Sequence, residues 1–166
     1  KLRYINAEYL RAMSEETFFT KAKPYIDSVV KTDCDKALLA EVLHPRCEVL
    51  SDIPEQVDFI DAMPEYDLAL YTNKKMKTTA KTAKEALAAA LPALEGIPAG
   101  GFTKDAVHEA MFALIAEKGV KNGWMLWPLR VALSGKQFTP GGGVELAAVL
   151  GKERTVARVK AALERL

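Results

Sequence analysis

The chain has 166 residues, of which 49% are apolar and 27% are charged. This length and balance fit one ordinary globular domain or two small ones with a real hydrophobic core. No stretch approaches the roughly 18 consecutive apolar residues of a membrane span, and the N-terminus lacks the apolar block of a signal peptide. We therefore expect a cytoplasmic protein without a membrane partner. The chain does not begin with Met, which indicates a piece of something longer.

The formal net charge of +1 argues against a general binder of polyanions, but the charge is distributed unevenly. Residues 121–166 contain 8 Lys and Arg against 3 Asp and Glu, whereas residues 1–120 contain 15 against 19. A basic C-terminal third is the electrostatic pattern expected of a segment that meets a phosphate backbone.

Apolar residues recur mostly at three- and four-residue steps, and alternating β-branched runs are missing, so we predict an all-α fold. In the first half, Asn6 precedes a predicted helix over residues 7–13. Ser14 precedes a second helix, whose first turn carries carboxylates that the helix dipole favours.

Further start and stop signals follow in the first half. Asp33 or Asp35 can cap a helix that the pair His44-Pro45 ends, because the residue before proline avoids helical ψ. Pro54 fits a first helical position before another apolar stretch.

A short polar stretch with a proline, residues 62–67, is the predicted domain boundary. It divides the chain into two helical subdomains, 1–68 and 69–166, the second carrying the basic third. We therefore expect a two-part helical bundle or cage.

The second half contains further predicted helices. One runs from Thr79 to about Leu94, and Thr103 caps another that Gly119 closes in a left-handed conformation. Two final helices flank Gly151, with a glycine-rich loop ahead of them.

We find no convergent set of catalytic groups and expect no catalytic residue, metal site or cofactor in this chain. His44 and His108 are each better explained as satisfied core or surface residues than as general bases. Cys34 and Cys47 match no familiar zinc spacing and are interpreted as reduced structural thiols, with a metal site and a disulfide as alternatives. The Gly141-Gly142-Gly143 run lacks the Lys-Ser/Thr of a phosphate-binding loop and is interpreted as a loop leading into a helix.

Three segments together resemble the C-terminal region of bacterial glutamyl-tRNA synthetases, and the resemblance extends over the whole chain. They are Leu2-Arg3-Tyr4-Ile5-Asn6 with Tyr9-Leu10-Arg11, Pro128-Leu129-Arg130-Val131-Ala132-Leu133-Ser134-Gly135 followed by Thr139-Pro140, and Leu150-Gly151-Lys152-Glu153-Arg154. The family usually has Trp in place of Tyr4 and Thr in place of Ser134. The glycine run is one residue longer than the shorter loops of the family.

The resemblance implies an α-helical cage of two domains that receives the anticodon loop of tRNA-Glu, and in some members of the family also that of tRNA-Gln. It further implies an N-terminal catalytic domain of the same chain that holds ATP, with magnesium, and glutamate, in a monomeric parent enzyme. Glutamate ligation then belongs to the parent, and this fragment alone is not an enzyme.

The same resemblance implies roles for individual residues. Arg130 and Thr139 match the residues beside the first two anticodon bases, with Pro140 supplying a backbone contact. Arg46 matches the position where an arginine reads the third anticodon base. In the basic third, four cations are predicted to contact the tRNA backbone: Lys136, Lys152, Arg154 and Arg158.

Each assignment has a structural alternative. Arg130 could pair with Glu145 or Glu153, Arg46 could be an ordinary surface charge, and Thr139 could cap a helix or turn. For the chain as a whole, the alternative is a helical protein-interaction module whose apolar groove holds a partner helix.

Two further clusters need interpretation. Lys74-Lys75-Met76-Lys77 is similar to the Lys-Met-Ser-Lys-Ser loop of class I tRNA synthetases but lacks its serines. Lys74 and Lys77, with Lys81 and Lys84, are predicted to form the solvated or tRNA-facing side of a helix. Trp124 and Trp127 could stack on bases, although their spacing beside apolar neighbours is more typical of a core.

Overall fold

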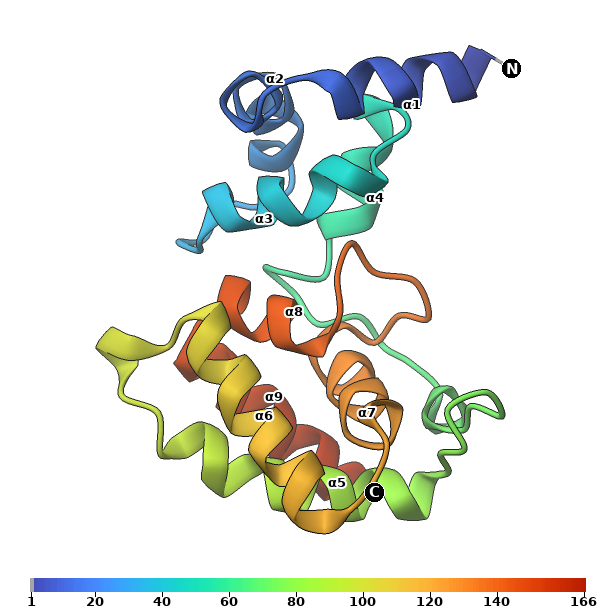
Figure 1. Ribbon diagram of the computed structural model, residues 1–166, viewed down its shortest axis with the longest axis vertical. Coiled ribbons are helices and arrows are strands. Elements are labelled where there is room, and N and C mark those ends of the chain that lie inside the picture. Colours follow the sequence, from blue (N-terminus) through green and yellow to red (C-terminus); the bar gives the residue numbers. More distant parts are fainter. Residues whose placement is uncertain (1) are drawn as a thin grey trace.

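The computed structural model describes residues 2–166, which form α-helices joined by loops and short 3-10 helices (Figure 1). The elements are α1 Leu2–Ala12, α2 Glu15–Asp27, α3 Lys36–Leu43, η1 His44–Arg46, η2 Leu50–Asp52, α4 Ile53–Val57, η3 Leu68–Tyr71, α5 Ala80–Glu95, η4 Ala99–Gly101, α6 Lys104–Lys118, α7 Asn122–Ser134, α8 Gly143–Leu150 and α9 Lys152–Arg165. The predicted all-α class is confirmed. Between residues 2 and 166, no helix is long and apolar enough to cross a membrane.

Several predicted helix boundaries are present as side-chain caps. The hydroxyl of Ser14 accepts from the backbone N–H of the third residue beyond it, and so do the side chains of Asp35 and Thr103. Gly119 closes α6 at φ 65°, in the left-handed conformation that glycine adopts without strain. Each cap contributes about 1 kcal/mol to its helix, which explains why these boundaries can be predicted from the sequence.

Two local predictions were wrong, namely the helix start after Asn6 and the helical placement of Lys74 and Lys77. α1 begins at Leu2, and Asn6 lies inside it, because the Asn6 amide donates to the carbonyl of Glu48 and not to its own helix. Residues 74–77 are not helical: Asn73 and Thr78 form an antiparallel bridge around a tight turn. The helix predicted from Thr79 is confirmed, since Thr79 caps α5, which starts at Ala80.

The helices form two groups. In Figure 1, α1–α4 lie together above and α5–α9 below, and the chain crosses between them after α4. α3 of the upper group packs on α8 of the lower one. The division predicted at residues 62–67 falls within this crossing segment and stays a prediction, because one hydrophobic core runs through both groups.

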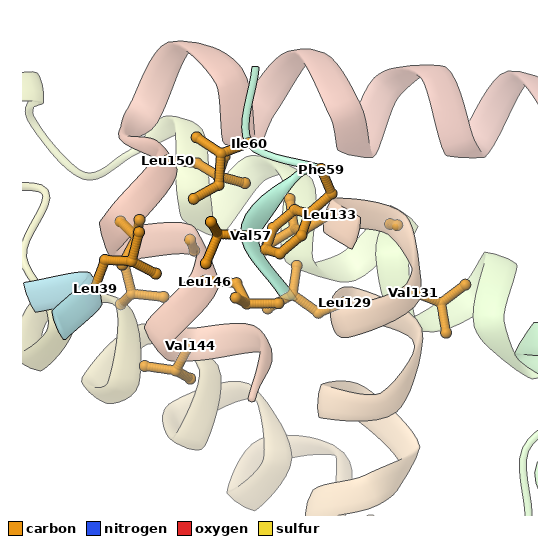
Figure 2. Packing of buried hydrophobic residues seen from close by; sticks show 14 of the residues in the cluster. Leu39, Val57, Phe59, Ile60, Leu129, Val131, Leu133, Val144, Leu146 and Leu150 are labelled. Atoms are coloured by element: carbon orange, nitrogen blue, oxygen red, sulfur yellow. The ribbon is translucent and has the colours of Figure 1, made fainter. Parts of the chain in front are cut away.

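That shared core fixes the two groups against each other. Figure 2 shows buried side chains of the upper group packed against side chains of α7 and α8. Those of the upper group are Leu39 of α3, Val57 of α4, and Phe59 and Ile60 just after α4. Those of α7 and α8 are Leu129, Leu133, Leu146 and Leu150, and all of these residues are buried. Full burial of each such side chain stabilises the fold by about 1.5–3 kcal/mol. The position of α3 relative to α7 is therefore set by packing, and with it the positions of the arginines that those helices carry.

Candidate nucleic-acid interface

Arg46 stands at the end of the 3-10 turn η1, which continues α3. The turn is held from beneath by His44, which is buried and stacks on Phe18 with ring centroids 4.4 Å apart. Its Nε2 lies 2.7 Å from the carbonyl oxygen of Leu10, and since a carbonyl only accepts, Nε2 carries the proton. Arg46 itself is exposed, and its Nη1 donates to the carbonyl of Val42 at 2.9 Å. One edge of the guanidinium is thus anchored while the other faces solvent.

Arg130 lies on α7 and is partly buried. Its guanidinium carbon lies 5.4 Å from the centroid of the Trp127 ring, a cation–π arrangement. Its Nε is buried without a hydrogen-bond partner. Within residues 2–166, no ion pair joins Arg130 to Glu145, Glu153 or any other carboxylate. The structural alternative of a paired Arg130 therefore has no support in the geometry.

Although Arg46 and Arg130 are far apart in sequence, the fold brings them close enough for their charges to interact. Burial lowers the pKa of Arg130, and the nearby positive charge of Arg46 lowers it further. A half-buried cation beside a second cation is unfavourable by itself. A partner that offers oxygen or nitrogen acceptors would stabilise both charges.

The loop 139–142 lies against the same end of α3. Thr139 donates its hydroxyl to the carbonyl of Gly141, and Pro140 is buried. A Cβ added to Gly141 would come within 2.6 Å of Cγ1 of Val42, so only glycine lets the loop approach so closely. The Thr139 hydroxyl therefore stabilises the turn, as its structural alternative proposed, while its contact with a base stays a prediction.

A polar hollow of about 450 Å³ opens next to Arg46, within the size range of small-molecule sites. It lies between the end of α3 and the starts of α2, α6 and α8. Cationic and acidic side chains both line it: Arg11, Arg46, Lys104, Glu15, Glu41 and Glu145. Arg46 is placed on its wall, where a planar group could receive the free edge of the guanidinium.

The two lysines that were predicted to contact the tRNA backbone form hydrogen bonds with protein oxygens instead. The ammonium of Lys136 donates to the carbonyl of Glu55 at 2.7 Å and pairs with the carboxylate of Asp58. Lys152 donates to the carbonyl of Glu95 at 2.8 Å, at the end of α5. Both lysines therefore tie loops and helix ends to the fold.

The two arginines of α9 that were predicted to contact the tRNA backbone also bond to protein oxygens. Arg158 donates at 2.8 Å to the carbonyls of Leu133 and Ile60, and burial lowers its pKa. Arg154 also bonds Ile60 at 3.2 Å and reaches the hydroxyl of Thr32 at 2.8 Å. These cations join the two helix groups, so their tRNA contacts stay predictions that the geometry does not favour.

One exposed residue near the site was missed by the sequence interpretation. Phe138 is 79% exposed and directly precedes Thr139. An aromatic residue inside a short polar and glycine-rich loop is the signal that could have identified it. Trp127, by contrast, belongs to the core, since it is buried and its indole N–H donates to the carbonyl of Leu70 at 2.9 Å.

The other histidine and the two cysteines lie in ordinary structural environments. His108 is exposed and stacks on Phe112 with centroids 4.1 Å apart. Cys34 and Cys47 are free thiols, and burial raises the pKa of both. Over the described residues 2–166, no cluster of His, Cys, Asp and Glu could hold a metal ion.

Comparison with known proteins adds to this geometry. Residues 7–163 match a family described as "Anticodon binding domain". The chain is 49% identical to a glutamate–tRNA ligase of Clostridium tetani and 46% identical to one of Clostridium botulinum, over all of its 166 residues. It spans about a third of the length of these curated relatives, 34% in each case.

Solved structures agree in fold. A glutamate tRNA ligase from Elizabethkingia meningosepticum superposes with a TM-score of 0.76 at 23% identity, over 99% of this chain and 32% of that one. The glutamate-tRNA synthetase of Elizabethkingia anophelis gives 0.74 at 22% identity, over 98% and 31%. At this identity the likeness establishes the fold alone.

Proposed function

Since the chain belongs to the family of anticodon-binding domains, we propose that it binds the anticodon loop of tRNA-Glu through Arg130 and Arg46. The observation that carries this proposal is the half-buried Arg130, whose buried Nε has no partner and which lies beside a second arginine. Bases of a single-stranded loop can splay out and offer their Watson–Crick edges to such donors. A planar guanidinium with five donors suits that task better than a lysine.

In this proposal, Arg130 and the Thr139-Pro140 loop contact the first two anticodon bases. Trp127 holds the Arg130 side chain in place by its ring face, which reduces the entropy lost on binding. The packing of the loop on Val42 supports the proposal, because it brings the loop to the end of α3, where Arg46 lies.

Arg46 reads the third anticodon base. Its Nη1 is anchored on Val42, so the remaining donors can form a fork toward a base in the adjacent hollow. The Watson–Crick edge of cytosine offers two neighbouring acceptors, O2 and N3, whereas the same edge of guanine carries the N1–H and N2–H donors beside a single acceptor, O6. Glutamate anticodons end in C and glutamine anticodons in G, so this contact would favour tRNA-Glu.

Glutamate ligation is assigned to the longer protein. The curated relatives are glutamate–tRNA ligases about three times as long as this chain. We place glutamate activation with ATP and magnesium in a catalytic domain outside these residues, with this chain as its tRNA-binding partner. The chain alone then neither ligates glutamate nor binds ATP specifically.

The alternative of a helical protein-interaction module is less well supported. Its mark would be an apolar groove with acidic surroundings, whereas the hollow beside Arg46 mixes acidic and basic side chains. Family membership also favours RNA over a partner helix.

Filter binding with unmodified tRNA-Glu tests the proposal. We expect saturable binding that weakens clearly between low and physiological salt, because counterions are released from the tRNA. No salt-sensitive binding at concentrations on the order of tens of micromolar, the range of even non-specific complexes, would overturn the proposal.

A further inference from the structure

A tight turn between η3 and α5 presents lysines on a rigid support. Asn73 and Thr78 exchange two backbone hydrogen bonds, of 3.1 and 3.0 Å. The Asn73 side chain accepts from the N–H of Met76 at 3.1 Å, and the Thr78 hydroxyl donates to the carbonyl of Tyr71 at 2.7 Å. We call residues 74–77, with the sequence Lys-Lys-Met-Lys, the lysine turn.

The backbone of the lysine turn is strained. Lys77 has φ 57°, and elsewhere in the described chain the left-handed region is occupied by glycines alone. A lysine adopts this conformation only when its surroundings impose it, and such strain is concentrated at functional positions. The turn could have been relaxed by glycine at this position, yet the sequence has a third lysine there.

The lysine turn is also pinned to α7. A Cβ added to Gly123 would lie 2.5 Å from Sδ of Met76, so the methionine occupies a notch that only glycine leaves open. Met76 contacts Gly123 but stays 37% exposed, and Lys74, Lys75 and Lys77 are exposed as well. No ion pair involves any of these three lysines in the described part of the chain.

The lysine turn and Arg130 share one face of α7. Gly123, Trp127 and Arg130 are spaced by four and three residues, which places them on the same side of the helix. Seven residues of helix correspond to about 10 Å along the axis. The carbonyl of Leu70, in the 3-10 turn just before the lysine turn, accepts from Trp127. Figure 1 shows the turn, in green, beside the lower end of α7.

We propose that the lysine turn binds the phosphate backbone of the same tRNA whose anticodon bases contact Arg130, an inference that rests on the proposed function. When a base of the RNA strand contacts Arg130, neighbouring phosphates of the same strand lie within reach of these lysines. Lysine is a compact point charge that suits phosphate without demanding a fixed geometry. Lys136, Lys152, Arg154 and Arg158 of the C-terminal third are bonded to protein oxygens, so the lysine turn offers the charge that they do not.

The test compares the salt dependence of tRNA-Glu binding in three proteins of full chain length. They are the unmodified chain, the double variant Lys74→Gln/Lys75→Gln, and a control double variant, Lys21→Gln/Lys160→Gln. The control removes the same charge from exposed positions on α2 and α9. Lys77 is left unchanged so that the strained backbone is not disturbed, and circular dichroism verifies that each variant is folded.

Each lost phosphate contact reduces the slope of log K against log salt by about 0.7–0.9. In the double variant, the magnitude of the slope of log K against log salt should decrease by about one to two units. Its affinity should fall about tenfold, equally for tRNA-Glu and an unrelated tRNA. The control should retain both. An unchanged slope in the double variant, while the unmodified chain binds, would overturn the inference alone, as would an equal loss in the control. Failure of the unmodified chain to bind any tRNA would overturn the proposed function and the inference together.

Discussion

The guanidinium carbon of Arg130 lies 5.4 Å from the centroid of the Trp127 ring. The indole N–H of Trp127 is bonded to the carbonyl of Leu70, so the ring cannot turn away from the arginine. Arg130 is thereby held half-buried with its Nε unpartnered, an arrangement that costs stability in the free protein. Such a cost is expected where a side chain is positioned for a ligand.

Replacing Arg130 should therefore separate stability from binding. In Arg130→Met we expect tRNA-Glu affinity to fall by about fivefold to more than a hundredfold, in line with about 1–3 kcal/mol for a bidentate base contact. The free energy of unfolding in urea should stay within about 1 kcal/mol of the original value or rise, because a half-buried cation without a partner is removed. Arg130→Lys should lose most of the affinity too, since the fork is lost. Normal affinity in Arg130→Met would contradict the assigned role.

Arg46 gives a prediction about the third anticodon base. Changing that base of tRNA-Glu from C to G should weaken binding by about 1–3 kcal/mol, or fivefold to more than a hundredfold. In Arg46→Ala the two transcripts should bind almost equally, because the discriminating donors are gone. Arg11→Ala, which alters the same hollow, is the matched control and should preserve the C-to-G ratio. Equal affinity of the unmodified chain for both transcripts would exclude recognition of the third anticodon base by Arg46.

Arg158 should prove to be a structural residue. Arg158→Ala leaves the carbonyls of Leu133 and Ile60 without their donor, and hydrogen bonds to charged groups contribute about 1.5–3 kcal/mol each. For the two bonds together we expect a loss of about 3–6 kcal/mol in urea denaturation. Lys160→Ala on the same helix removes only an exposed ion pair of 3.6 Å with Glu95, so its effect should stay below about 1 kcal/mol.

The salt dependence of tRNA binding decides between the two roles of Arg158. In folded Arg158→Ala, the slope of log K against log salt should match that of the unmodified chain. A slope lower by about one unit, with little loss of stability, would instead support the phosphate contact predicted from the sequence.

The contrast between Ser14 and Arg158 explains how far the sequence could lead. Ser14 acts on a residue three positions ahead, so its role as a cap follows from local pattern. Arg158 binds the carbonyl of Ile60, far away in the chain, and no local pattern names that partner. The basic third therefore suggested a phosphate-binding surface, whereas most of its cations hold protein oxygens.

In the candidate site, too, individual residues could be predicted from the sequence, whereas their arrangement in space could not. Arg46, Arg130 and Thr139 could be named from family motifs, but their approach to one another depends on the core between α3, α7 and α8. The lysine turn was predicted as a helix face, because the lysines also fit helical spacing. The competing signal was Asn73, whose side chain favours a turn by bonding the N–H of Met76.

Gly141 tests whether the loop must lie against α3. In Gly141→Ala the new methyl group would be 2.6 Å from Cγ1 of Val42 and 3.2 Å from Cβ of Glu145. Overpacking of this kind costs about 1–3 kcal/mol, and the loop should move away from Arg46, lowering tRNA affinity. Gly100→Ala, where an added Cβ meets nothing within 4 Å, is the control and should change neither stability nor binding.

The double variant Gly141→Ala/Val42→Ala completes the cycle. Removing the Val42 methyl groups makes space for the new Cβ, so the combined loss of stability should be smaller than the sum of the two single losses. For residues in direct contact, a coupling of about 0.5–3 kcal/mol is expected. Affinity for tRNA-Glu should recover in part, since the loop can return to its place beside α3. Strict additivity of the two single effects would mean that the contact does not hold the loop, and that Thr139 and Pro140 are positioned by other means.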